Sequence, residues 1–332
     1  MKVCIIGAGS IGGIVAVRLS HLCDLTVVLR GANLSAVTRN GIRLITKSGE
    51  SKKVRVKTVE SLAGLSKQDL IVLSVKAHQI KILVNDIKKI IHNKTIILTM
   101  QNGIPWWYFC KLDGPFNNYH LNSVDPKGFI LSNINSDLII GTVIYMASQT
   151  IKPGIIKSNE EEKIAFGELD GSTSERLKKI CNLFTEAGFK ANLKTDIRSE
   201  IWLKLWGNSS FNPVSALTHN TLLDICKSKF GKELILKMCY EIQKVGEYFG
   251  AQFSISMEER VEVAKNVGHH KTSMLQDIEY GKDIELDALL GSVIELGEIA
   301  KIQTPHLKSI YACCNLLQNK IKSTCGRLKI DI

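Results

Sequence analysis

A lysine and two asparagines recur at helical spacing within one apolar segment. Lys204, Asn208 and Asn212 stand four residues apart, so a helix would place them along one side, drifting about 40° at each step. The flanking residues are large and apolar, namely Trp202, Leu205, Trp206 and Phe211. A buried ammonium and two buried amides need polar partners, which a ligand can supply. The alternative is a solvent-facing stripe, and Pro213, which lacks an N–H group, should end or kink the helix.

An acidic stretch is the second candidate for chemistry. Its carboxylates follow Ser273 closely in the sequence, at Asp277, Glu279, Asp283, Glu285 and Asp287. Such runs usually form an exposed acidic face. The functional alternative is that Glu285 meets Lys204, so that each group shifts the pKa of the other. Spacing alone leaves both interpretations open.

A glycine-rich turn near the N-terminus has the pattern of a dinucleotide-binding site. An apolar run, 3–6, leads into Gly7-Ala8-Gly9-Ser10-Ile11-Gly12, then a helical pattern and a second apolar run, 25–29. Gly7 would make the tight turn, Gly9 would admit a pyrophosphate and Gly12 would let the helix pack closely on the strand. The pyrophosphate would then lie at the positive end of the new helix. The alternatives are a flexible glycine loop and a secretory signal, and the four glycines argue against a signal.

Arg30 stands at the end of the second apolar run, where NAD sites usually carry an acidic residue for the ribose 2′-OH. A guanidinium can fork onto a phosphate, so Arg30 favours NADP(H). The alternative is an ordinary surface arginine.

Two further polar residues follow buried strand patterns. Lys76 comes after the apolar run 69–75, and Asn102 comes after the run 95–100. Ligands of doubly wound sheets bind beyond the carboxyl ends of the strands, so both side chains are expected in that crevice. For Asn102 the alternative is plain turn chemistry, because Asn-Gly dipeptides favour turns.

The remaining patterns predict two domains. Residues 42–59 resemble a hairpin, and further strands are expected within 138–147, 154–157 and 163–167. Residues 106–136 are either a lid or an ordinary insertion. From residue 197 onward only helical periodicities remain, at 199–211, 213–225, 228–250, 256–266, 271–281, 285–300 and 304–319. We therefore expect a Rossmann-type α/β domain with a doubly wound parallel sheet over 1–196, followed by an all-α domain over 197–332.

Composition narrows the class of protein. The chain has 332 residues, of which 45% are hydrophobic and 23% charged, as in soluble globular proteins. No apolar stretch approaches the roughly 20 residues of a membrane helix. The nine cysteines show no metal-site spacing, so we expect reduced thiols, a cytoplasmic protein and no metal. The net charge of +11 is spread without an aromatic-interleaved basic stripe, which argues against a nucleic-acid partner.

Together these motifs resemble the ketopantoate reductase (2-dehydropantoate 2-reductase) family over nearly the whole chain. The matching residues are Gly7 to Gly12, Arg30, Ser74-Val-Lys76-Ala, Gln101-Asn102-Gly103, Lys204 with Asn208, Asn212 and Pro213, Ser273-Met-Leu-Gln-Asp277, and Glu285-Leu-Asp287.

The resemblance implies reduction of 2-dehydropantoate to (R)-pantoate with NADPH, in the biosynthesis of pantothenate and coenzyme A. It implies that Lys204 is the general acid, with Glu285 between cofactor and substrate. Asn208, Asn212 and Ser273 match substrate-binding positions of the family. Asn102 would touch substrate and nicotinamide ribose, and Lys76 and Ala147 would lie on the cofactor side.

One family position departs from the pattern. A further asparagine is expected about ten residues after Asn212-Pro213, where this chain has Leu222, with Asn220 nearby but shifted. We retain Asn220 as a substrate-binding candidate. The alternatives are an NADP-dependent reductase of another 2-oxo acid and a non-catalytic NADP sensor. A small-molecule 2-oxo acid is the expected partner, with neither a membrane nor a nucleic acid, and a homodimer is left open.

Overall fold

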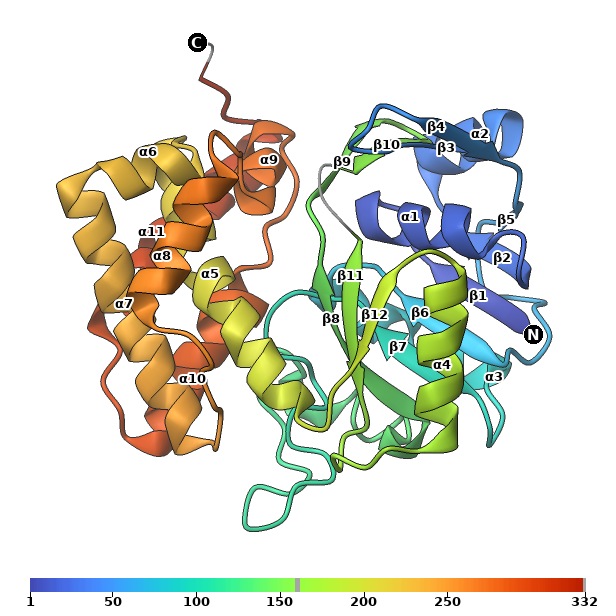
Figure 1. The fold of residues 1–332 in the computed structure, drawn as a ribbon, viewed down its shortest axis with the longest axis horizontal. Helices are drawn as coiled ribbons and strands as arrows, with labels where there is room; N and C mark the ends of the chain where they lie inside the picture. Colours follow the sequence, from blue (N-terminus) through green and yellow to red (C-terminus); the bar gives the residue numbers. More distant parts are fainter. Residues whose placement is uncertain (159–161, 331–332) are drawn as a thin grey trace. The chain divides into compact units, whose positions relative to one another are not determined.

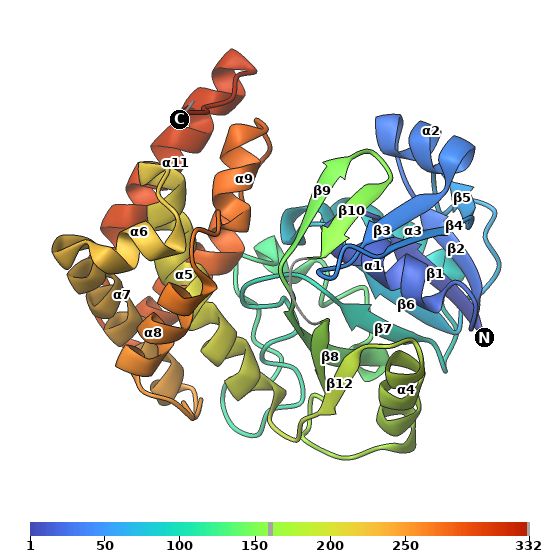
Figure 2. The same ribbon diagram turned by 45° about the horizontal axis from the view of Figure 1, so that its top comes forward.

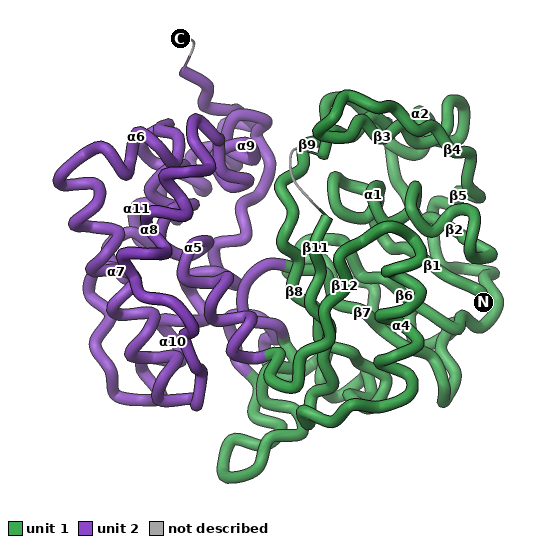
Figure 3. Tube along the Cα trace, viewed as in Figure 1, with its two compact units in different colours: residues 1–101, 106–120, 127–197 green, residues 102–105, 121–126, 198–332 purple. Residues whose placement is uncertain are grey.

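The computed structural model describes residues 1–158 and 162–330, and its contacts divide the chain into two compact units (Figure 3). Unit 1 comprises Met1–Gln101, Trp106–His120 and Lys127–Ile197. Unit 2 comprises Asn102–Pro105, Leu121–Pro126 and Arg198–Ile332. Short pieces of the 106–136 region thus belong to different units. The assignment of cofactor binding to a domain 1–196 and of substrate binding to a domain 197–332 stays a prediction. Residues 331–332 lie outside the described part.

Unit 1 is built on an eight-stranded sheet (Figure 1). Its strands are β1 (Lys2–Ile6), β2 (Asp24–Val28), β5 (Lys57–Val59), β6 (Leu70–Leu73), β7 (Ile96–Thr99), β8 (Ile139–Tyr145), β11 (Lys163–Gly167) and β12 (Lys190–Leu193). They lie in the order β12-β11-β8-β7-β6-β1-β2-β5. All neighbouring pairs are parallel except β8 with β11. The predicted Rossmann-type fold is confirmed, and its strand order reverses between β1 and β6, where doubly wound sheets bind ligands.

The described residues of this unit form four α-helices: α1 (Ser10–Leu19), α2 (Gly31–Asn40), α3 (Val84–Ile90) and α4 (Glu175–Glu186). β1 and β6 are almost continuously apolar because both faces of a parallel sheet are buried. Val3 and Ile5 of β1 share one hydrophobic core with Ile14 of α1 and Phe184 of α4. The core therefore fixes the helix that follows the glycine turn.

A second, four-stranded sheet packs against α1 (Figure 2). Its strands are β3 (Ile42–Ile45), β4 (Ser51–Val54), β9 (Ser148–Lys152) and β10 (Ile155–Ser158), in the order β4-β3-β10-β9. The hairpin predicted over 42–59 is confirmed for β3 and β4, which pair antiparallel. Its last part is wrong, because Lys57–Val59 crosses to the larger sheet and pairs with β2. The alternating pattern is the same in β4 and β5, and it does not show that β4 pairs with β3 while β5 pairs with β2.

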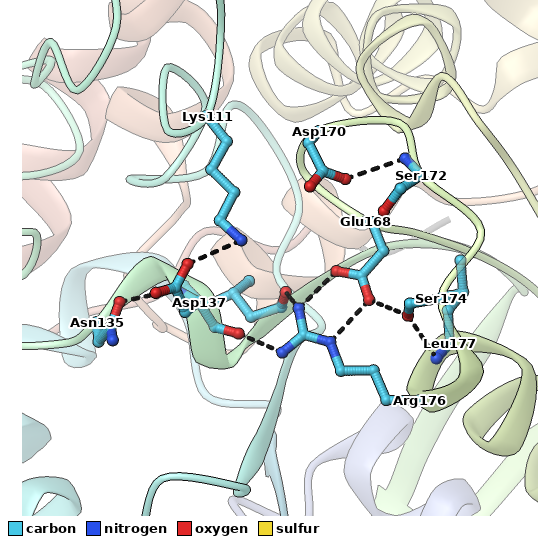
Figure 4. Close-up of polar contacts among 10 residues, drawn as sticks. Lys111, Asn135, Asp137, Glu168, Asp170, Ser172, Ser174, Arg176 and Leu177 are labelled. Carbon is cyan, nitrogen blue, oxygen red and sulfur yellow. Dashed lines mark hydrogen bonds and ion pairs between the residues drawn. The ribbon is translucent and has the colours of Figure 1, made fainter.

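A partly buried ionic cluster contacts the start of α4 (Figure 4). We call it the Arg176 cluster; it comprises Arg176, Glu168, Ser174 and Asp137. Arg176 Nε and Nη2 donate to the two carboxylate oxygens of Glu168 at 2.7 and 2.5 Å. Ser174 Oγ also donates to Glu168, while it accepts from Leu177 N as the N-cap of α4. Arg176 Nη1 donates to the backbone oxygen of Asp137. These contacts hold the first turn of α4 to Glu168 and Asp137 within unit 1.

Unit 2 is helical. Its helices are α5 (Ile197–Thr218, whose first residue belongs to unit 1), α6 (Leu222–Lys227), α7 (Lys229–Tyr248), α8 (Met257–Val267), α9 (Ser273–Glu279), the π-helical η5 (Asp287–Gly291), α10 (Ser292–Ala300) and α11 (Pro305–Thr324). Pro213 was expected to end or kink the helix; the end is wrong, because α5 continues to Thr218, and the kink stays a prediction. Phe211 and Val214 beside the proline are buried, and this packing offsets the roughly 3 kcal/mol that an internal proline costs. Among the described residues, no helix is both long and apolar enough to cross a membrane.

Candidate functional site

The three glycines of the N-terminal turn have different surroundings in unit 1. Gly7 has a positive φ of 92°, which L side chains rarely adopt. A Cβ on Gly12 would lie 2.0 Å from Gly7 O and 2.2 Å from Ser74 Oγ, so only glycine fits there. A Cβ on Gly9 would meet nothing within 4 Å. Two glycines therefore shape the turn, and the third leaves open space beside the first residues of α1.

Ser74 stabilises this turn from the neighbouring strand end. Its Oγ contacts Gly7 O at 2.5 Å and Ile6 O at 3.2 Å, as a donor to the carbonyls. From the sequence, Ser74 was recognised only as part of a motif, and this role was missed. Its position directly after β6, beside the end of β1, was the available signal. Gln101 adds a further tie, because its Nε2 donates to Leu73 O and Val75 O at 2.7 and 3.0 Å.

The other cofactor candidates also lie at element ends of unit 1. Arg30 is exposed and is the N-cap residue of α2. Lys76 is half-buried directly beyond β6, and Ala147 lies between β8 and β9. The first turn of α1 carries Ser10 and Ile11, with Ala8 buried below the turn. Their contacts with a cofactor stay predictions.

Four of the expected catalytic and substrate residues meet within unit 2, and we call them the Lys204 cluster: Lys204, Asn102, Asn208 and Glu285. Lys204 Nζ donates to Asn102 Oδ1 at 2.7 Å. Asn208 Nδ2 approaches the same oxygen at 3.5 Å. The amide nitrogen of Asn102 donates to Glu285 Oε2 at 3.3 Å. Asn102 thus bridges the ammonium and the carboxylate, although these side chains come from distant parts of the sequence.

The backbone beside Asn102 is held against the π-helical segment η5. Ile104 N donates to Ala288 O at 2.9 Å. Gly103 has a positive φ of 86°, and a Cβ there would lie 2.1 Å from Ala288 O. This close approach requires glycine. The Asn-Gly pair, for which plain turn chemistry was the alternative, therefore also positions a member of the Lys204 cluster.

Burial dominates the electrostatics of Lys204. Desolvation lowers the pKa of its ammonium from 10.5 to about 8, and the nearby Glu285 carboxylate opposes this by raising it. A pKa near 8 leaves the group protonated at neutral pH but able to release its proton readily. The arrangement can donate a hydrogen bond and then a proton to a developing oxyanion.

The remaining substrate candidates lie elsewhere in unit 2. Asn212 is buried one turn beyond Asn208 on α5. Ser273 is the exposed first residue of α9, and Asn220 is exposed between α5 and α6. Their roles stay predictions.

The acidic stretch does not form a single solvated face. Glu279 pairs with Lys271 at 2.6 Å, and Asp283 pairs with Lys322 at 3.2 Å. Glu285 instead accepts from Asn102. Among residues 1–158 and 162–330, no group of three or more His, Cys, Asp or Glu side chains is arranged to hold a metal ion.

Comparison with known proteins shows the family to which this chain belongs. The model of ketopantoate reductase PanE/ApbA matches residues 3–171, and that of its C-terminal part matches residues 196–318. The chain belongs to the ketopantoate reductase family. It is 42% identical over 314 residues to 2-dehydropantoate 2-reductase of Mesorhizobium japonicum, covering 94% of this chain and 96% of that one. Membership makes the protein an oxidoreductase.

Solved structures of the ketopantoate reductase fold agree. A proposed ketopantoate reductase from Ralstonia solanacearum MolK2 superposes with a TM-score of 0.90 at 33% identity, covering 96% of this chain and 98% of that chain. D-mandelate dehydrogenase with NADH and anilino(oxo)acetate gives a TM-score of 0.84 at 18% identity, covering 97% and 100%. At that identity the likeness shows the fold alone.

Proposed function

We propose that this protein reduces 2-dehydropantoate to (R)-pantoate with NADPH, and so serves the biosynthesis of pantothenate and coenzyme A. The observation that carries the proposal is the Lys204 cluster. Its ammonium has a pKa lowered to about 8 and donates to an amide that also binds a carboxylate. The 42% identical relative, itself named 2-dehydropantoate 2-reductase, supports the choice of substrate.

The glycine turn fits the pyrophosphate of a dinucleotide. Gly9 leaves open space beside the start of α1, and Gly9 as its N-cap residue provides no side-chain cap for the helix N–H groups. Those groups suit an anion. Arg30, exposed at the start of α2, would bind the 2′-phosphate, while Lys76 and Ala147 would lie beside the cofactor. The proposed cofactor is therefore NADP(H).

When bound, NADPH would supply a hydride from C4 of its nicotinamide for the reduction of the C2 carbonyl of the substrate. Lys204 would polarise this carbonyl and then give its proton to the alkoxide oxygen. Asn102 holds the ammonium through a 2.7 Å hydrogen bond, and Glu285 favours its protonated form. Glu285 would thus support the acid rather than donate the proton itself.

Asn208, Asn212 and Ser273 would hydrogen-bond the carboxylate and hydroxyl groups of the substrate, with Asn220 as a further candidate. An alternative substrate is another 2-oxo acid, since D-mandelate dehydrogenase shares the fold. A pure NADP sensor is disfavoured, because binding alone gives no reason to bury a lysine with a lowered pKa. The cytoplasmic location and the homodimer stay predictions.

The test is an assay of cofactor oxidation with 2-dehydropantoate, pyruvate and oxaloacetate, each with NADPH and with NADH. We expect the highest kcat/KM for 2-dehydropantoate with NADPH. A higher kcat/KM for pyruvate or oxaloacetate would contradict the proposed substrate, and preference for NADH would contradict the proposed cofactor. Absence of turnover with tight NADPH binding would favour the sensor.

A further inference from the structure

Asn33 joins the glycine turn to a loop of the second sheet. It lies in the first turn of α2, three residues after Arg30. Its Nδ2 donates to Ala8 O at 2.9 Å, and its Oδ1 accepts from Gly154 N at 3.0 Å. Ala8 stands between Gly7 and Gly9 of the turn. One half-buried amide therefore holds three segments of unit 1 together.

The loop at Gly154 is itself fixed against α2. Gly154 O accepts from Arg43 N at 2.8 Å, which ties the loop to β3. Gly154 has a positive φ of 75°, and a Cβ there would lie 3.2 Å from Gly41 O and 3.3 Å from Val37 Cγ2. The loop thus packs on the C-terminal end of α2, while Asn33 binds it from the N-terminal end. The Gly154 loop of the second sheet therefore contacts α2 near both of its ends.

We infer that Asn33 is a positioning residue for cofactor choice, which sets the separation between the pyrophosphate-binding turn and the Arg30 end of α2. The inference rests on the proposed function, in which these two places bind the two phosphate sites of one NADP(H) molecule. The part of NADP(H) that would contact both places corresponds to adenosine 2′,5′-bisphosphate. Its phosphates are covalently linked, so both can bind well only if the two protein segments are held at a matching distance.

A purely structural role for Asn33 gives a different expectation. Loss of its two hydrogen bonds would then lower stability and weaken all dinucleotides in equal proportion. A positioning role instead weakens the phosphorylated cofactor more than NADH, because NADH has no group for Arg30 to bind. The ratio of the two affinities separates these interpretations.

The experiment measures Kd for NADPH, NADH and adenosine 2′,5′-bisphosphate in the wild type and in Asn33→Leu, which keeps the side-chain size. Asn33→Ala serves as a second variant in case leucine disturbs folding. Asn40→Ala is the matched control, an exposed asparagine at the end of the same helix. Thermal unfolding without ligand reports on the fold.

For both Asn33 variants we expect Kd for NADPH and adenosine 2′,5′-bisphosphate to rise about tenfold, as loss of two hydrogen bonds allows. Kd for NADH should rise less than about threefold, since only the pyrophosphate turn is affected. KM for NADPH should rise with Kd, while kcat at saturation changes much less. Asn40→Ala should match the wild type.

Equal losses for NADPH and NADH, or an unchanged NADPH/NADH ratio in both Asn33 variants, would overturn the inference while leaving the proposed function intact. A wild type that binds NADH as tightly as NADPH would overturn both the proposed cofactor and the role of Asn33.

Discussion

Two partly buried cationic side chains of this protein have their charge compensated in different ways. Arg176 donates to both carboxylate oxygens of Glu168, and this hydrogen bonding raises the pKa of its guanidinium. Lys204 donates to a neutral amide, and burial lowers the pKa of its ammonium to about 8. The Arg176 cluster compensates its charge directly, whereas the Lys204 cluster inserts Asn102 between cation and carboxylate.

The difference separates a structural ion pair from a candidate proton donor. A bidentate arginine pair holds its proton permanently and fixes geometry, here the start of α4. A lysine desolvated beside an amide keeps a proton that can leave near neutral pH. We therefore expect incomplete compensation of its charge, rather than burial alone, to distinguish the candidate proton donor Lys204 from the structural residue Arg176.

Lys204→Ala should have the largest effect on turnover. Loss of the general acid is expected to lower kcat between about a hundredfold and ten-thousandfold. The Kd for NADPH should stay close to the wild-type value, because the glycine turn and Arg30, proposed to bind the phosphates of the cofactor, are in unit 1. Steady-state kinetics and NADPH titration measure the two quantities. A lowered affinity for NADPH with an unchanged kcat would contradict the assignment of Lys204 as the general acid.

Arg176→Met should mainly reduce stability. The side chain of Glu168 is only 4% exposed, and the substitution removes its cationic partner. We expect this to lower the free energy of unfolding by about 3 kcal/mol. The kcat of the folded fraction should be unchanged. Urea unfolding and a temperature-matched assay check both. Equal stability of variant and wild type would show that the Arg176 cluster contributes no more than a surface pair.

Lys204→Met is the matched change in the other cluster, and we expect no such loss of stability. The folded-state pKa of Lys204, about 8, lies below its ordinary 10.5, so the unfolded state binds more protons between these pH values. Wild-type stability should therefore rise with pH across this window relative to the variant. Urea unfolding at the two ends of the window measures the difference. A parallel pH dependence of both proteins would contradict the lowered pKa.

Glu285→Gln should give the smallest of these effects. Glu285 raises the pKa of Lys204 against desolvation, so its neutral replacement should lower that pKa further. The fall in kcat/KM at alkaline pH should then begin at a lower pH than in the wild type. Profiles of both proteins measure this shift. A shift to higher pH would show that Glu285 does not favour the protonated amine.

Much of the fold could be predicted because it depends on local patterns. The glycine spacing, the apolar strands and the helical periodicity after residue 197 each reflect neighbouring residues. The predictions that were wrong concern features that depend on residues distant in the sequence. Lys57–Val59 joined β2 rather than the hairpin, and buried neighbours carried α5 past Pro213. Both outcomes are decided by tertiary packing.

The Lys204 cluster was predictable in part. Helical spacing put Lys204 and Asn208 on one side, the end of a buried strand indicated Asn102, and the acidic stretch offered Glu285 as a partner of Lys204. The resemblance then implied roles for these residues. The bridging role of Asn102 needed the structure, because Gly103 approaches Ala288 O across a large gap in sequence. Ser74 and Asn33 were missed because their hydrogen bonds are to backbone groups, and residue type gives no sign of these partners.

The pH dependence of kcat/KM for the 2-oxo acid, with saturating NADPH, tests the central claim most directly. If the reaction requires the protonated form of Lys204, kcat/KM should be level at neutral pH and fall tenfold per pH unit above about 8. Lys204→Arg, which stays protonated throughout, should lose this fall in whatever activity remains. A wild-type profile that stays level to about pH 10, near the ordinary pKa of lysine, would contradict the assignment of Lys204 as the proton donor.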